Sequence, residues 1–189
     1  MTLFLTRAFF NEFSLWVLLT PLIFSPLLLL SFSGELFTLI FFMCMCACAL
    51  VFSKYHEVKQ QYALVLQIAP IPTNAVRQVN LLFLSSIAGY YIIFSLIAGT
   101  FVYALFRKTL LFPSLHELAF LIGSCIILIA VNSWQLKLYK TYTLLILNFL
   151  FVFAFTSFHV PKLAADFGYI VLSFALLLLA ITLLTYRRV

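Results

Sequence analysis

Long apolar runs separated by short polar connections make up almost the whole chain. Helices are the expected membrane-spanning form, because the runs are unbroken and lack the period-2 alternation of a barrel strand. A helix needs roughly 17–25 apolar residues to cross the hydrocarbon core of a bilayer. The runs that approach this length are residues 13–32, 36–53, 81–106, 119–134, 141–158 and 168–186. The pattern predicts an all-α polytopic membrane protein with six transmembrane helices in a single domain, residues 1–189.

Composition and charge indicate how such a chain lies in the membrane. Hydrophobic residues make up 66% of it and charged residues 8%, against about 25% charged residues in a typical soluble domain. In a six-span arrangement, eight basic residues fall on one side and Arg107, Lys108 and Lys162 on the other. Cytoplasmic loops carry the excess of Lys and Arg, so both termini are expected in the cytoplasm. If one of the short fourth and fifth runs formed only a re-entrant hairpin, the downstream topology would reverse.

The amino-terminal residues 3–13 mix phenylalanines with polar side chains. They predict either an amphipathic lead-in that lies in the headgroup plane or a frayed start of the first span. The apolar run that follows is longer than the 7–15 residues of a secretory signal core. We therefore expect it to remain attached as a membrane span.

Catalytic and metal-binding patterns are scarce. The five acidic residues lie at or beyond the ends of the predicted spans, and no HExxH, GxSxG or GxxxxGK[ST] pattern occurs. Cys44 and Cys48 share a helix face and Cys46 points elsewhere, while the three histidines fall in loops. We expect these small residues, with Gly89, Gly99 and Gly123, to allow close helix packing. The prediction is a protein that is not an enzyme, with no metal site and no cofactor of its own.

Uncharged polar residues remain inside the predicted spans. They suit a path for a hydrophobic or amphipathic cargo, although hydrogen bonding between helices is the simpler interpretation of each one. The candidate path residues are Tyr90, Tyr91, Ser95, Asn132 and Asn148.

The longest polar interruption is residues 54–80, which begin with charged residues and contain an apolar patch, a Pro-Ile-Pro break and a short helical pattern. Six spans with both ends inside and such a first inner loop resemble the permease subunits of type-2 ABC exporters, in particular the small bacterial permeases for peptides, including phenol-soluble modulin exporters. The matching run is Ala69-Pro70-Ile71-Pro72-Thr73-Asn74-Ala75-Val76-Arg77. It departs from the family pattern at Ala69, where leucine is common, and at Thr73 and Asn74, where a basic pair is frequent.

The resemblance implies that the inner loop carries a cytosolic coupling helix between the second and third spans, which docks on a separate ATP-binding subunit. It also implies two such subunits that bind ATP and Mg, a second permease protomer, identical or a sister chain, and a peptide cargo in a bacterial cytoplasmic membrane. Nucleic acid is not an expected partner. The loop 159–167, with Pro161, is expected to form a short re-entrant gate. The candidate coupling residues are Tyr55, Glu57, Lys59, Tyr62, Leu66, Ile68, Pro70, Pro72, Val76 and Arg77.

Three alternatives remain open. The inner loop can instead rest on anionic lipid, since the same mixture of aromatic and basic residues suits an interfacial helix. A haem-exporter permease has a similarly long, proline-containing first inner loop. A membrane scaffold that transports nothing fits the lack of catalytic groups.

Overall fold

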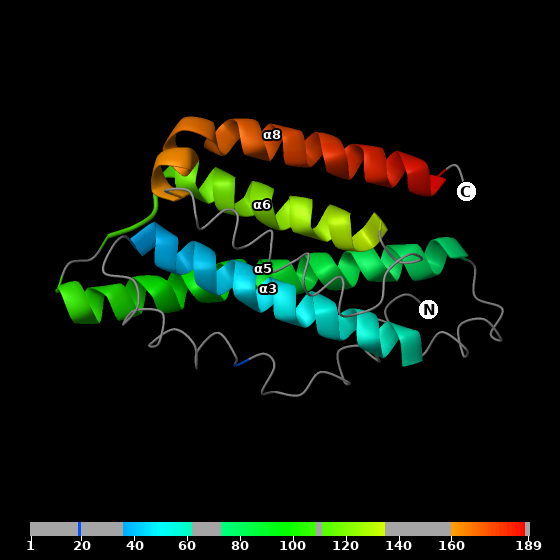
Figure 1. Ribbon diagram of the computed structural model, residues 1–189, viewed down its shortest axis with the longest axis horizontal. Coiled ribbons are helices and arrows are strands. Elements are labelled where there is room, and N and C mark those ends of the chain that lie inside the picture. Colours follow the sequence, from blue (N-terminus) through cyan, green and yellow to red (C-terminus); the bar gives the residue numbers. More distant parts are fainter. Residues whose placement is uncertain (1–18, 20–35, 62–72, 109–110, 135–159, 188–189) are drawn as a thin grey trace.

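The described residues of the computed structural model, 19, 36–61, 73–108, 111–134 and 160–187, are almost entirely helical, and no strand occurs among them. Long helices are α3 (Leu36–Gln61), α5 (Thr73–Arg107), α6 (Leu115–Trp134) and α8 (Val160–Arg187) (Figure 1). Each contains a stretch long and apolar enough to cross a membrane: residues 36–55, 78–105, 115–133 and 164–184. The predicted helical fold is thereby confirmed for the described residues, with a helix of spanning length and apolarity at four of the six predicted positions. The predicted spans 13–32 and 141–158 and the lead-in 3–13 lie outside the described residues.

Helices α3 and α5 extend well past the apolar runs that predicted them. Residues 54–61 continue α3 and residues 73–80 begin α5, although the sequence placed both in the inner loop. Lys, Glu and Gln are good helix formers, so nothing in residues 54–61 ends the helix. Residues 62–72, which lie outside the described residues, separate the two helices. The short helical pattern predicted after the Pro-Ile-Pro break is not a separate helix, because residues 73–80 are the first turns of α5; a coupling role for this segment stays a prediction.

The connection between α5 and α6 is short because both helix ends are capped locally. Lys108 has a left-handed backbone, with φ of 55°, and its amide donates to the carbonyl of Ala104 at 2.9 Å, which closes α5. The Ser114 amide donates to a Glu117 carboxylate oxygen at 2.7 Å, and the Glu117 amide donates to the Ser114 hydroxyl at 3.3 Å. This reciprocal capping box starts α6 ahead of the predicted residue 119.

Helix α8 corrects the prediction for residues 159–167. The chain is helical from Val160 onward, so residues 160–167 are the first turns of a helix and not a loop; their role as a gate stays a prediction. Pro161 lies in the first turn, where its missing N–H removes no helical hydrogen bond. The first turns of α8 lie against the start of α6 (Figure 1).

Three of the four helices run in the same direction. Helix α5 is antiparallel to α3, since Gly99 lies against Ile40 at one end and Phe83 stacks on Tyr55 at the other. Helix α6 is parallel to α3, because Phe120 packs on Phe41 and Cys125 lies beside Cys44. Helix α8 is parallel to α6: His116 meets Tyr169, and Leu172 lies close to Gly123. Trp134 and Val160 therefore lie at opposite ends of the bundle.

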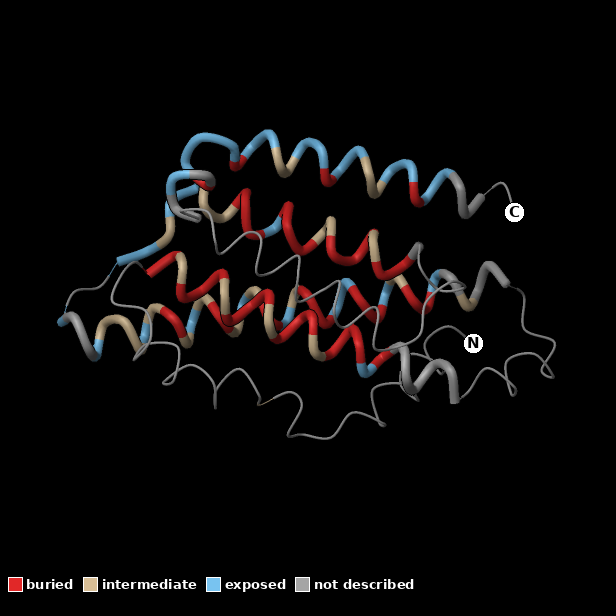
Figure 2. Tube along the Cα trace, viewed as in Figure 1, coloured by how far each residue is buried: buried red, intermediate tan, exposed pale blue. Residues whose placement is uncertain are grey.

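Burial differs sharply between the central and outer helices (Figure 2). In α3, 78% of the most apolar window is buried, against 17% in α8. Phe37, Phe41 and Phe120 form an aromatic cluster between α3 and α6, with ring centroids 5.5–6.4 Å apart. The large apolar side chains exposed on α8 include Phe167, Tyr169, Ile170, Phe174, Leu176, Leu177, Ile181, Leu183 and Leu184. Such a surface suits contact with lipid.

Glycines set the closest helix contacts. A Cβ on Gly123 would lie 2.9 Å from the backbone nitrogen of Leu172, and one on Gly168 would collide with the carbonyl oxygen of His116. A Cβ on Gly99 would meet Ile40, whereas one on Gly89 would have nothing within 4 Å. The predicted close packing is confirmed at Gly99 and Gly123, and Gly89 has no such contact with the described residues. Gly168 adds a contact that the sequence analysis did not identify.

The contact of Gly168 with the α6 backbone predicts that a side chain there destabilises the fold. Gly168→Val forces α8 away from α6, and we expect a loss of about 1–3 kcal/mol, the usual range for overpacking. Gly89→Val adds the same volume where space is open and should change stability by less than about 0.5 kcal/mol. Thermal unfolding in detergent, followed by helical circular dichroism, measures both. Equal losses in the two variants would contradict the close α6–α8 contact.

Candidate functional site

Helices α3 and α5 are joined at the point where both leave their apolar spans. The Tyr55 ring stacks on Phe83, with centroids 4.5 Å apart and planes at 20°, and its hydroxyl donates to the side-chain oxygen of Asn80. All three residues are buried, with Tyr55 0%, Phe83 0% and Asn80 1% exposed. The apolar span of α3 ends at Tyr55, and that of α5 begins at Gln78. We call Tyr55, Asn80 and Phe83 the α3–α5 junction.

The junction gives Tyr55 a different environment from the one expected for a partner-binding anchor. Its ring contacts α5 and is fully buried, so Tyr55 holds two helices together instead of presenting a surface. A buried tyrosine hydroxyl and a buried amide both need a hydrogen-bond partner. Each supplies the other, which also fixes the register of α3 against α5.

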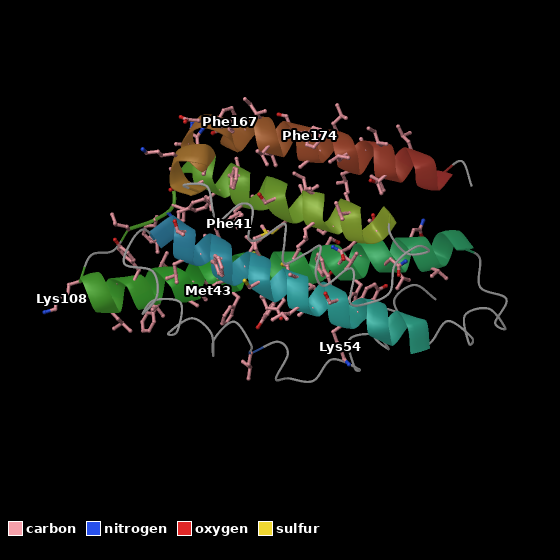
Figure 3. The ribbon with its side chains drawn as sticks, viewed as in Figure 1. Phe41, Met43, Lys54, Lys108, Phe167 and Phe174 are labelled. Carbon is pink, nitrogen blue, oxygen red and sulfur yellow. The ribbon has the colours of Figure 1, made fainter. Side chains whose placement is uncertain are left out.

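The other candidate coupling residues fall into two groups. Glu57 and Lys59 lie in the last turns of α3, and Val76, which is partly exposed, and Arg77 lie in the first turns of α5. All four therefore belong to the helical ends that project past the junction. The remaining candidates lie outside the described residues: Tyr62, Leu66, Ile68, Pro70 and Pro72. Lys54, which is exposed, lies toward this end of the bundle and Lys108 toward the opposite end (Figure 3).

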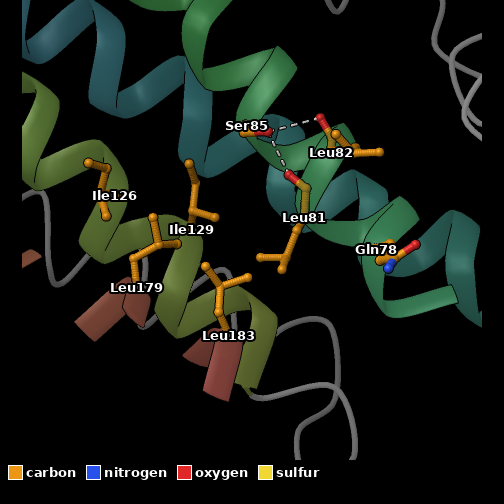
Figure 4. A pocket seen from close by; sticks show the side chains of 8 residues that line it. All are labelled: Gln78, Leu81, Leu82, Ser85, Ile126, Ile129, Leu179 and Leu183. Carbon is orange, nitrogen blue, oxygen red and sulfur yellow. Dashed lines mark hydrogen bonds between the residues drawn. The ribbon is translucent and has the colours of Figure 1, made fainter. Parts of the chain in front are cut away.

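An apolar pocket lies between α5, α6 and α8, with a volume of about 460 Å³. Most of its lining is leucine and isoleucine (Figure 4). The Ser85 hydroxyl donates to the carbonyls of Leu81 and Leu82 at 2.7 and 3.1 Å, so the hydroxyl is bonded to its own helix. The residues that line the pocket are Gln78, Leu81, Leu82, Ser85, Ile126, Ile129, Leu179 and Leu183. A pocket with this lining suits an apolar chain, and its described residues offer no charge to an ion.

The pocket and the junction share one segment of α5. Asn80 and Phe83 contact Tyr55 of α3, and Gln78, Leu81, Leu82 and Ser85 line the pocket. A displacement of α3 with this end of α5 would therefore alter one wall of the pocket, while α6 and α8 supply the others.

The structure does not gather the candidate path residues into this pocket. Tyr91, Ser95 and Asn132 are buried, and none of them lines it. The Ser95 hydroxyl donates to the carbonyl of Tyr91 at 2.5 Å, and the Asn132 amide donates to that of Leu128 at 2.8 Å. Tyr90 is 41% exposed and contacts Tyr91 and Phe94. Asn148 lies outside the described residues.

A cluster of three cysteines was not predicted from the sequence, because one of the three belongs to a helix far away along the chain. Cys125 of α6 lies beside Cys44 and Cys48 of α3, and their three sulfur atoms all lie within 4.8 Å of one another. The Cys44 and Cys125 sulfurs are 3.7 Å apart. The prediction of no metal site rested on the cysteines of α3 alone, which offer too few ligands for a metal ion. Packing of α3 on α6 supplies the third thiol.

No protein-family model, no curated protein and no solved structure matches the chain. The geometry of the junction, the pocket and the cysteine cluster is therefore the basis for a functional hypothesis.

Proposed function

We propose that this chain is the membrane-spanning subunit of an ATP-driven exporter in a bacterial cytoplasmic membrane. Its cargo is a hydrophobic or amphipathic molecule, most simply a peptide, and separate ATPase subunits bind and hydrolyse the ATP. The observation that carries the proposal is the α3–α5 junction: it ties together the two helices that project toward residues 62–72, and it lies on the α5 segment that lines the pocket.

The helix directions support the six-span arrangement. Trp134 and Val160 lie at opposite ends of the bundle, because α6 and α8 are parallel, as expected if a further span separates these two helices. About 20 helical residues cross the roughly 30 Å hydrocarbon core, and the predicted span 141–158 lies between these two helices in the sequence. With six spans, the basic residues at the junction end favour a cytoplasmic position for that end and for both termini.

The ends of α3 and α5 that project beyond their spans would transmit movement of the ATPase to the rest of the bundle. Helix α3 continues from Tyr55 to Gln61, and α5 starts at Thr73, ahead of Gln78. At 1.5 Å per residue, each end reaches about 8–9 Å beyond its span. They present residues 62–72, with Tyr62, Leu66, Ile68, Pro70 and Pro72, to a groove in the ATPase. Apolar anchors surrounded by charged residues are typical of such interfaces.

Transport requires that movement of these helix ends changes the shape of the pocket. ATP binding draws the ATPase subunits together and carries residues 62–72 with them. The junction makes the adjoining ends of α3 and α5 move as one unit, so the α5 wall of the pocket shifts against α6 and α8. A cargo that bound both shapes equally would not be moved. The two shapes must therefore bind the cargo with different affinities, and the apolar lining provides this when its walls separate.

The pocket lining also bears on the type of cargo. The described residues that line it include no acidic or basic side chain, which favours an apolar side chain or acyl chain over an ion. They include no His, Cys, Met or Tyr either, and these are the side chains that hold haem iron. The lining therefore favours a peptide-like cargo over haem.

Copurification tests whether an ATPase subunit binds this chain. Wild-type protein from native membranes in mild detergent should bring down an ATP-binding protein, and the variant Tyr62→Asp/Leu66→Asp/Ile68→Asp should not, because three charges disrupt an apolar contact. Lys108→Asp is the control, since it changes the charge at the opposite end of the bundle and should leave the partner bound.

The triple variant must elute as a folded protein for the comparison to hold. If folded wild-type protein brings down no ATPase, or the triple variant retains it, the exporter proposal is wrong and the scaffold interpretation replaces it.

The junction hydrogen bond gives a separate prediction about coupling. Tyr55→Phe keeps the stack on Phe83 but leaves the Asn80 oxygen without this donor, which should cost about 1 kcal/mol. We expect the ATPase to remain bound while cargo moved per ATP hydrolysed falls in proteoliposomes.

Tyr103→Phe is the matched control, because it removes the same hydroxyl from α5 far from the junction. Unchanged transport in Tyr55→Phe, or an equal loss in Tyr103→Phe, would show that the junction does not transmit movement.

A further inference from the structure

Three thiols meet between α3 and α6 in a place that the proposed transport function does not use. Cys44 and Cys48 lie one helical turn apart on α3, and Cys125 faces them from α6. Cys44 and Cys48 are 0% exposed and Cys125 is 2% exposed. Cys46, between the first two in sequence, is only partly buried and does not belong to the group.

The cluster lies near the middle of two candidate membrane spans. Cys44 and Cys48 are near the centre of the α3 span, residues 36–55, and Cys125 is near the centre of the α6 span, residues 115–133. Its surroundings are apolar, since the same core cluster contains Phe41, Met45 and Phe120. Any species bound there exchanges water for an apolar environment.

We propose that Cys44, Cys48 and Cys125 form a three-sulfur binding site for a trivalent thiophilic metalloid, with arsenic(III) as the type case. The ligand set selects soft ions, because it consists of sulfur alone. Structural zinc takes four ligands in a tetrahedron, whereas the group contains three among the described residues. A disulfide would use two of the sulfurs and leave the third unpaired, and at 3.7 Å the Cys44 and Cys125 sulfurs are not bonded.

The net charge of the complex with three thiolates differs between the soft ions. Cysteine binds metals as the thiolate, so three thiolates around a cuprous ion carry two net negative charges, and three around a divalent ion carry one. A net charge at the centre of the bilayer is costly. Three thiolates around arsenic(III) carry none, which makes the trivalent centre the one that this environment accepts without a compensating cation.

The binding step keeps the charge balanced throughout. Arsenous acid, As(OH)₃, arrives uncharged. Each cysteine thiol replaces one hydroxyl group: an As–O bond breaks, an As–S bond forms, and the thiol proton leaves with the hydroxyl as water. Three such exchanges release three waters, and neither arsenic nor sulfur changes its oxidation state.

Once formed, the three As–S bonds would join α3 to α6 covalently. The site stands on the sulfur geometry alone and does not depend on the exporter proposal.

Arsenite binding to purified full-length protein in detergent tests the site, with a phosphine reductant so that no other thiol is present. We expect one arsenic per chain after gel filtration and protection of Cys44, Cys48 and Cys125 from alkylation, read residue by residue by mass spectrometry. Arsenic X-ray absorption should show three sulfur neighbours. Cys46→Ser should bind like wild type, and Cys125→Ala should lose at least about tenfold in affinity.

Several results would overturn the proposal. The first is wild-type protein that binds less than one arsenic per chain, and the second is an equal loss of affinity in Cys46→Ser and Cys125→Ala. The third is displacement of arsenite by an equal concentration of cuprous ion, supplied as its acetonitrile complex. Circular dichroism and gel filtration establish that each variant is folded. If Cys125→Ala does not fold, the stoichiometry and the pattern of protected cysteines in wild type still decide the question.

Discussion

Lipid is as apolar as the side chains that these helices bury, so burial of leucine or phenylalanine gives little preference for one arrangement over another. The arrangement has to come from contacts that lipid cannot replace. Several hydroxyl groups of the described spans do not supply them: those of Ser53, Ser95 and Thr100 bond to carbonyls of their own helices. A small number of interhelical polar contacts and close backbone approaches must therefore fix the fold.

Helix α3 shows how such contacts define a register. The hydrogen bond from Tyr55 to Asn80 fixes α3 against α5 at one end, and the Ile40 side chain against Gly99 fixes it near the other. Against α6, the thiols of Cys44 and Cys125 meet next to the ring pair of Phe41 and Phe120. Sliding α3 by one turn would break all of these contacts together, while an apolar surface alone would tolerate the shift.

Hydropathy predicted the helices of the described residues well, because it reports which residues can face lipid. It misplaced their ends, since a helix ends where its backbone is capped and not where it leaves the membrane. The extension of α3 to Gln61 and the start of α6 at Leu115 both follow from this difference. The Ser114 and Glu117 capping box was nevertheless readable from the sequence, because Ser-x-x-Glu before an apolar run is a known start signal.

The pocket, the cysteine cluster and the role of Tyr55 could not be predicted from the sequence. The pocket is lined mainly by leucine and isoleucine from three helices, and these residues are too common in a membrane protein to mark a site. Cys125 joins Cys44 only through the packing of α3 on α6, so neither segment alone indicates the cluster. Tyr55 looked like a partner anchor because a tyrosine beside charged residues suits an interface equally well. Only the position of Asn80 one helix away distinguishes the two roles.

These contacts divide the described helices into two units. The junction joins the adjoining ends of α3 and α5, and the close approaches at Gly123 and Gly168 join α6 to α8. The interface between the units holds the aromatic cluster, the three thiols and the pocket. Tightly packed cores resist continuous deformation and change by discrete shifts of rigid elements. In the proposed function, a force applied through residues 62–72 would act on the first unit, and the resulting shift would occur at this interface, which also contains the pocket.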